Sequence, residues 1–242
     1  MIPLCLPYEQ KDHAKKLGAR WDGTEKVWHI PDGVDPRLFE EWLPRVYVKQ
    51  YFPDRVPGLP LTVEVVPQTC HFSNVRSLLA EEDWNSIRKI VYGQAGRRCE
   101  ICGDKGPAHP VEAHEIWDYD DKSHIQRLDG IVALCPPCHQ VKHIGFAQVQ
   151  GKHLDAFNHL LKVNNLTWAQ GEEYLEQVLH VYLDRSEHEW VLDCSMLEEH
   201  GYSIDTSDRW SGRSEEMREE ALDTEQEPDF VVRVFYRAQG VE

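Results

Sequence analysis

The sequence has no long apolar run, and its basic residues are scarce. No apolar stretch approaches the roughly 18 residues that a membrane-spanning helix needs, and the N-terminal stretch is far too short for a signal peptide. We therefore expect a soluble, cytoplasmic protein with no membrane partner. Lys and Arg number 26 against 42 Asp and Glu, for a formal net charge of −16. Phosphate binding depends on Lys and Arg, so any surface for nucleic acid must be local.

The cysteines of this sequence also do not suggest a disulfide framework, because there are seven of them and an odd number cannot all pair. Of the seven cysteines, four form two C-x-x-C pairs, Cys99 with Cys102 and Cys135 with Cys138. Each tight C-x-x-C turn directs two sulfurs at one point, so two such pairs predict a tetrahedral zinc site. We interpret these four residues as ligands of one structural zinc ion in a reducing compartment.

Two histidines follow the second cysteine pair. His139 is adjacent to Cys138, and His143 lies four residues further on. A helix that begins at this pair would place both imidazoles on one face, because side chains at i and i+4 align. The spacing therefore indicates a second metal ion. Two alternatives are that a histidine replaces a cysteine on the zinc, or that both histidines pack without a metal.

The same stretch resembles the zinc-stapled version of the HNH nuclease family. The resemblance covers roughly residues 80–145 and depends on the two cysteine pairs, on His139, and on His114 within Val-Glu-Ala-His-Glu. It implies a treble-clef or ββα-metal module that hydrolyses phosphodiester bonds in DNA. His114 would be the general base. His139 would bind a catalytic cation such as Mg²⁺, Mn²⁺, Ni²⁺ or Zn²⁺, and His143 resembles the extra ligand of colicin-type nucleases.

The sequence departs from the family pattern at two positions. Ala113 stands where a metal-binding Asp or His is usual, and Gly130 stands where the middle Asn is usual. Hard divalent cations accept carboxylate oxygen, so nearby acidic residues are candidates to complete the metal shell. These candidates are Glu112, Glu115, Asp118, Asp120 and Asp121. The departures also favour a competing hypothesis, in which the module no longer cuts and instead binds nucleic acid or a protein.

The first 50 residues have the pattern of a separate small domain. Strands are predicted at 2–6 and 26–30, helices at 8–17 and 36–43, and a turn at 19–23. The pattern Ala-Lys-Lys-Leu-Gly-Ala-Arg-Trp-Asp, followed by Trp-His-Ile-Pro, resembles a small uncharacterised domain that precedes primase-like and other DNA-processing modules. Arg20 and Trp21 either bind nucleic acid by phosphate contact and stacking or belong to the core, where we expect Trp28.

The whole chain is predicted to be α+β, with four regions. They are a βαβα-type accessory domain at 1–50, a linker with one strand at 51–79, the zinc module with supporting helices at 80–204, and an acidic segment at 205–242. Within them, helices are predicted at 81–93, 154–163 and 167–183, and a strand at 190–192.

Two charged segments flank the zinc module. Arg88, Lys89, Arg97 and Arg98 precede the first cysteine pair and are predicted to contact nucleic acid, with a solvated helix face as the alternative. Residues 205–242 are rich in Asp and Glu. They are interpreted as a solubilising tail, or as a mimic of nucleic-acid charge that binds within the chain or to a protein partner.

Overall fold

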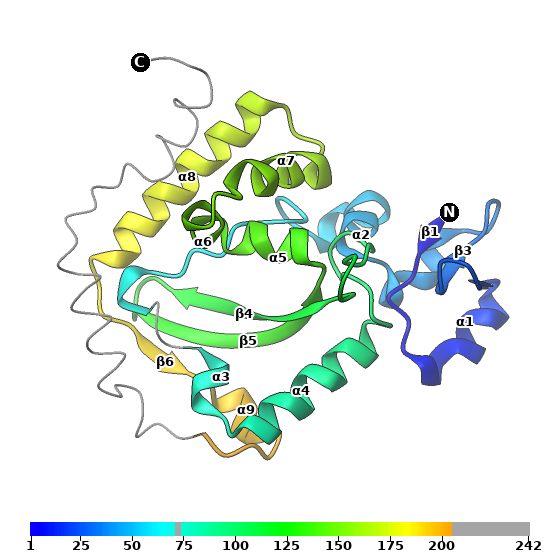
Figure 1. Cartoon of the computed structure of the whole chain (residues 1–242), viewed down its shortest axis with the longest axis horizontal. Helices are drawn as coiled ribbons and strands as arrows, with labels where there is room; N and C mark the ends of the chain where they lie inside the picture. The colour runs from blue at the N-terminus through cyan, green and yellow to red at the C-terminus, as the bar shows by residue number, and fades with distance from the viewer. Residues whose placement is uncertain (71–73, 205–242) are drawn as a thin grey trace. The chain divides into compact units, whose positions relative to one another are not determined.

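A computed structural model of the chain describes residues 1–70 and 74–204. The protein is a mixed α+β fold with small sheets (Figure 1). It divides into two compact units. The first consists of Met1–Val63, Arg88–His114 and Ile131–Thr167, and the second contains Glu64–Ile87, Glu115–Gly130 and the chain from Trp168 onward. The predicted boundaries at residues 50, 79 and 204 stay predictions, and the acidic segment 205–242 lies outside the described residues. No described helix is long and apolar enough to cross a membrane.

The first unit begins with a small antiparallel sheet in the order β1-β3-β2. Its strands are β1 (Ile2–Pro3), β2 (Arg20–Asp22) and β3 (Val27–Ile30). The predicted turn at 19–23, and with it the βαβα order, is wrong, because Arg20–Asp22 pairs with β3 and brings Trp21 opposite Trp28. The turn lies at residues 23–26, where the Asp22 carboxylate accepts hydrogen bonds from the N–H groups of Thr24 at 2.8 Å and Glu25 at 3.0 Å.

Short helices complete the N-terminal part of this unit. They are η1 (Tyr8–Gln10), α1 (Lys11–Leu17), η2 (Pro36–Trp42), α2 (Arg45–Tyr51) and η3 (Pro53–Arg55). α1 ends at Gly18, whose φ of 108° suits glycine. The helix predicted at 36–43 is a 3-10 helix with a kink at Phe39. The core contains Leu4, Phe39 and Trp42, and Trp28 packs against it, which confirms the core role expected for Trp28.

The segment after η3 belongs to neither sheet of the described residues. Residues 62–67 carry no regular secondary structure, where the sequence predicts a strand. The side-chain amide of Asn164 takes the place of a neighbouring strand at Leu61. Its oxygen accepts from the Leu61 N–H at 3.0 Å and its nitrogen donates to the Leu61 carbonyl at 2.8 Å. Prolines on both sides of the segment lack the N–H that a sheet ladder requires.

A strand pair and four helices form the rest of the first unit and continue into the second. The elements are α4 (Glu81–Gln94), β4 (Glu112–Asp120), β5 (Ile125–Leu134), α5 (Pro136–Lys142), α6 (Ile144–Val149) and α7 (His153–Asn164). β4 and β5 are neighbours in the second sheet, and α5 follows β5 directly. Figure 1 shows α5, α6 and α7 packed together. The predicted helices at 81–93 and 154–163 are therefore confirmed.

The second unit contains the part of this sheet that lies within Glu115–Gly130. Its further elements are η4 (Gln68–Cys70), α3 (Val75–Leu78), α8 (Trp168–Ser186), β6 (Val191–Asp193) and α9 (Ser195–Glu199). β6 pairs in parallel with Ile125–Arg127 of β5, so the strand predicted at 190–192 is confirmed with a shift of one residue. The Arg185 guanidinium of α8 lies 4.2 Å from the Tyr119 ring centre and donates to Asp121 at 2.7 Å.

The N-terminal part of the first unit packs directly on the loop of the first cysteine pair. The N–H groups of Arg45 and Val46 donate to the carbonyls of Glu100 at 2.7 Å and Ile101 at 3.0 Å. A Cβ built on Gly103 would lie 2.7 Å from the Pro3 ring and 2.9 Å from the Pro44 ring. The loop and the small domain therefore fit together only because residue 103 has no side chain.

Replacing Gly103 with Ala should lower the free energy of unfolding by about 2 kcal/mol or more. The new methyl group meets two rigid proline rings, and the φ of 82° at Gly103 disfavours a side chain. Urea unfolding measures the effect. Gly130→Ala is the matched control, because a Cβ there meets nothing within 4 Å. Equal unfolding midpoints for the two variants would contradict this account.

Candidate metal centres

Four cysteine sulfurs converge in the first unit, and we name them the sulfur cluster: Cys99, Cys102, Cys135 and Cys138. Their sulfur atoms all lie within 4.8 Å of one another, and those of Cys102 and Cys135 are 3.6 Å apart. A zinc ion with bonds of about 2.3 Å to four sulfurs needs them roughly 3.8 Å apart. The residues therefore fit a structural metal ion, as the sequence predicts.

Local structure directs both cysteine pairs inward. The first pair lies on a turn after α4, closed by the Gly103 N–H donating to the Cys99 carbonyl at 2.8 Å. In the second pair, Cys135 is the N-cap of α5 and prolines occupy the first positions of that helix. Proline has the fixed φ and missing N–H that suit a helix start. The cap therefore positions Cys135 and Cys138 one turn apart.

The electrostatics of the sulfur cluster also favour a cation. Hydrogen bonds from Cys102 and the other thiols lower the pKa of Cys99, and the interactions with Cys135 and Cys102 raise the pKa values of Cys102 and Cys138, respectively. One thiolate can thus be shared among the four sulfurs, but further ionisation is opposed by repulsion. A divalent cation removes that repulsion, because the thiolate is the form that binds metal.

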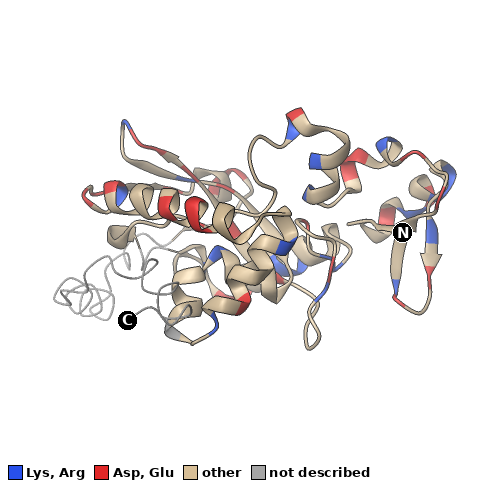
Figure 2. Ribbon diagram, turned by 90° about the horizontal axis from the view of Figure 1, so that it is seen from above, with Lys and Arg blue, Asp and Glu red and all other residues tan. Residues whose placement is uncertain are grey.

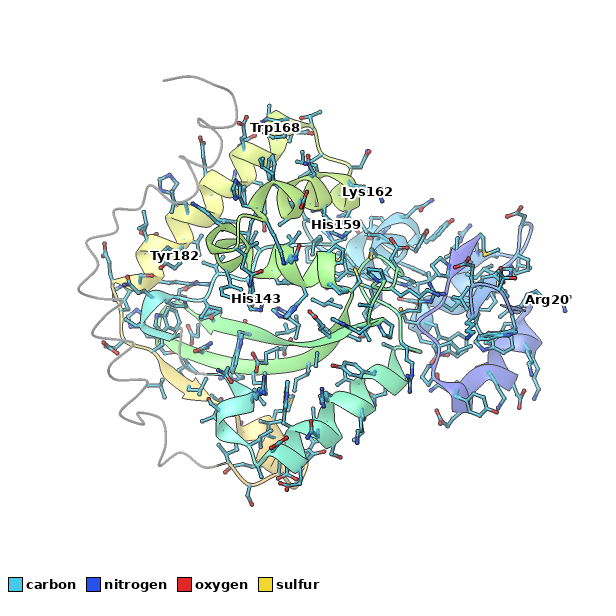
Figure 3. All side chains as sticks on the ribbon, in the orientation of Figure 1. Arg20, His143, His159, Lys162, Trp168 and Tyr182 are labelled. Carbon is cyan, nitrogen blue, oxygen red and sulfur yellow. The ribbon has the colours of Figure 1, made fainter. Side chains whose placement is uncertain are left out.

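His159 is a residue of this centre that the sequence did not reveal. It comes from α7, and Figure 3 labels it. Its Nε2 lies 3.2 Å from the Cys138 sulfur, so a protonated Nε2 can donate a hydrogen bond to a thiolate there. Outer groups of this kind orient metal ligands and tune their basicity. No sequence signal separates His159 from the other histidines, because it depends on how α7 packs against α5.

Three imidazoles converge nearby, and we name them the imidazole cluster: His114, His139 and His143. Each offers a ring nitrogen, and these atoms lie within 4.8 Å of one another. The ring centres of His114 and His143 are 4.9 Å apart, as are those of His139 and His143. His114 is 3% exposed, whereas His143, at the junction of α5 and α6, is exposed (Figure 3). The predicted alignment of His139 with His143 is confirmed.

The two clusters are distinct groups. All four sulfurs belong to one group and all three imidazoles to the other. A histidine is therefore not needed to complete the sulfur cluster, which disfavours the mixed site considered from the sequence.

Glu112 lies behind His139. Its Oε2 is 2.5 Å from Nδ1 of His139, and its Oε1 is 2.7 Å from Nε2 of His109. Burial raises the pKa of Glu112, but its contacts with His109 and His139 outweigh burial and lower it overall. An ionised carboxylate can only accept hydrogen bonds, so both imidazoles donate to it. His139 then keeps Nε2 as its free ligand atom.

The other candidate carboxylates are engaged in the second unit. Glu115 accepts a hydrogen bond from the Val75 N–H at 2.9 Å, and burial raises its pKa to about 7. Asp118 lies 4.0 Å from Arg127. Asp120 accepts from the Lys122 N–H at 3.0 Å and so fixes the turn after β4, and Asp121 pairs with Arg185. Glu112 is therefore the only one of the five candidates that touches the imidazole cluster in the described contacts.

The candidate basic residues do not form one surface. Arg98 is 7% exposed, and it donates to the Glu25 carbonyl at 2.9 Å, so it links the cysteine loop to the β2-β3 turn. Lys89 and Arg97 are exposed and Arg88 is half-buried. Figure 2 shows Lys and Arg interspersed with Asp and Glu along the ribbon. The exposed residues remain candidates for nucleic acid, whereas Arg98 has a structural role.

Arg20 and Trp21 lie on β2, an edge strand of the N-terminal sheet. Trp21 is 51% exposed and its ring lies 5.5 Å from that of Trp28. Arg20 is exposed as well (Figure 3). Their positions agree with a binding surface better than with a core role.

Replacing His159 with Ala should weaken zinc binding by about 10- to 100-fold without changing its stoichiometry, because a donor to Cys138 is lost. Competition with a chromophoric chelator measures the affinity. Cys135→Ala should abolish zinc binding at the sulfur cluster, and His180→Ala, an exposed position on α8, should leave the affinity unchanged. Equal affinities of wild type and His159→Ala would argue against the outer-ligand role.

Comparisons with known proteins match only the N-terminal part. Residues 1–44 match the family described as "Domain of unknown function (DUF5710)". An Escherichia coli protein described as "DNA primase TraC" is 51% identical over 39 residues, which are 16% of this chain and 4% of that protein. A second protein of the same description and organism is 49% identical over 37 residues, 15% of this chain and 3% of its own length.

The chain thus spans only a small fraction of the relatives that it matches. No solved structure matches it. The similarity agrees with the resemblance noted for residues 1–50 and does not extend to the sulfur and imidazole clusters.

Proposed function

We propose that the chain is a metal-dependent nuclease of the HNH type, which hydrolyses phosphodiester bonds in DNA on a treble-clef or ββα-metal module. One observation carries this proposal. Ring nitrogens of His114 on β4, His139 on α5 and His143 directly after α5 lie within 4.8 Å of one another. His139 is also the residue that follows Cys138 of the sulfur cluster. Imidazole nitrogens are ligands for divalent cations such as Zn²⁺ and Ni²⁺.

The residues of the imidazole cluster hold a cation through neutral rings. His139 offers Nε2, because its Nδ1 donates to Glu112, and His143 lies one helical turn away. A divalent cation bound there would stabilise charge on the phosphate and lower the pKa of a coordinated water. Because protonated imidazoles cannot bind a metal, metal occupancy and cleavage should both fall at acidic pH.

Two roles are available to His114, general base and metal ligand. The family resemblance implies a general base, and a base must lie within hydrogen-bond reach of the water that it activates. His114 is 3% exposed, and its ring centre is 4.9 Å from that of His143 and 5.3 Å from that of His139. Burial and these short distances favour a ligand role. We therefore propose three imidazole ligands, with Glu112 orienting His139 from behind.

A module that binds without cutting is the second candidate. Ala113 offers no ligand atom, and Gly130 has open space where a side chain would be. If these departures abolished catalysis, the sulfur cluster would still hold the scaffold. Exposed residues such as Trp21 and Lys89 would then serve to bind nucleic acid or a protein.

Metal content and strand cleavage together test the proposal. Purified protein should contain two metal ions per chain by elemental analysis. It should nick supercoiled plasmid with Mg²⁺, Mn²⁺, Ni²⁺ or Zn²⁺, and single-stranded DNA and RNA serve as further substrates. His139→Ala should lose the second ion and at least about 100-fold of the activity. His200→Ala, at an exposed position on the second unit, is the control.

The variant His114→Ala distinguishes the two roles of that residue. Loss of the second metal ion together with activity identifies a ligand. Loss of activity with the ion retained identifies a base. One metal ion per chain, no cleavage of any substrate and no effect of the His139 and His114 substitutions would refute the nuclease and favour the binding module.

A further inference from the structure

An exposed aromatic side chain lies next to the imidazole cluster. Phe146 on α6 is 63% exposed, whereas its neighbours Ile144 and Ala147 are buried. α6 begins directly after His143, and the Ala147 N–H donates to the His143 carbonyl at 2.9 Å. Residues three positions apart lie on the same side of a helix. The exposed imidazole of His143 and the exposed ring of Phe146 therefore share one side of this short helix.

The chain around α6 carries no acidic residue. Residues 130–154 contain no Asp or Glu, in a sequence with 42 of them, and the acidic residue that follows is Asp155. Lys152 is exposed, and its N–H donates to the Ala147 carbonyl at 2.7 Å. This bond places Lys152 at the C-terminal end of α6, a helix of six residues that is roughly 9 Å long. An exposed cation therefore lies within reach of Phe146, in a segment that has no acidic side chain of its own.

An exposed aromatic ring beside a cation matches the chemistry of an unpaired nucleotide. Every base has a π-face that stacks on an aromatic ring, and phosphate pairs with lysine. In a duplex the faces of the bases are already stacked on one another, so they are unavailable to Phe146. An uncharged apolar partner would gain from the ring but not from the absence of acidic side chains.

We propose that Phe146 stacks on an unpaired base next to the phosphate at the imidazole cluster, and that Lys152 contacts a neighbouring phosphate. The substrate class is then single-stranded or locally unpaired nucleic acid. This inference rests on the proposed function, since it takes the imidazole cluster as the place of the scissile phosphate. In this proposal, α6 distinguishes single-stranded from double-stranded nucleic acid.

Binding of fluorescently labelled oligonucleotides tests this assignment. Anisotropy is measured for a 20-nucleotide single strand of DNA, the same sequence as RNA, and the matching DNA duplex, and gel analysis of each oligonucleotide after the measurement checks that it is uncut. Phe146→Ala should weaken single-strand binding by about 5- to 100-fold and change duplex binding by less than about twofold. Phe146→Tyr should restore single-strand binding, and Val181→Ala, at an apolar position that is 40% exposed on α8, should leave it unchanged.

Lys152→Ala supplies a second measurement. It should make the salt dependence of single-strand binding shallower by about one phosphate contact. Thermal unfolding of each variant checks that these exposed positions do not alter folding. Equal losses on single strand and duplex, no loss on either, or no binding of any nucleic acid would overturn the assignment.

The outcomes separate this inference from the proposed function. Cleavage of plasmid with unchanged strand preference in Phe146→Ala would preserve the nuclease and refute the stacking role. Single-strand binding that depends on Phe146, without cleavage under any metal, would refute the nuclease and preserve the stacking role.

Discussion

The convergence of four sulfurs fixes the start of α5, and the imidazole cluster depends on that start. Cys135 is the N-cap of α5 and Cys138 lies within its first turn, so a metal ion at the sulfur cluster would tie this end of the helix to the loop after α4. His139 is the next residue and His143 follows one turn later. Two of the three imidazoles are therefore placed by the same constraint that holds the fold. The third comes from β4, on which His114 is buried.

Two further elements support the sulfur cluster. His159 reaches Cys138 from α7, and main-chain hydrogen bonds from Arg45 and Val46 hold the loop at Glu100 and Ile101. A zinc-binding turn has little apolar surface of its own, so it gains rigidity mainly from such contacts. Rigid ligands lose less conformational entropy when they bind a metal ion. The small N-terminal domain thus supports the sulfur cluster as well as preceding it in the sequence.

The sequence predicted those features that follow from short, regular spacings. The C-x-x-C pairs led to the sulfur cluster, and the i, i+4 pair His139 and His143 led to the imidazole cluster. Features that depend on distant packing were missed. β2 read as a turn because three residues give little periodicity, and its strand character comes from pairing with β3. Arg98 was predicted to be a surface cation, but its guanidinium donates a hydrogen bond to the carbonyl of Glu25. The position of Glu112 behind His139 also required the geometry of α5.

The carbonyl of Glu25 shows what the N-terminal match means for this chain. It lies in the β2-β3 turn and accepts both from Arg98 at 2.9 Å and from Lys105 at 3.1 Å, residues far outside the matched segment 1–44. The rings of Pro3 and Pro44 are likewise covered by the glycine at 103. A fragment cut at residue 44 would expose those rings to water and leave the Glu25 carbonyl without its two donors. The sequence similarity thus covers residues 1–44, whereas the part of the chain that packs together as one folded body extends through the cysteine loop.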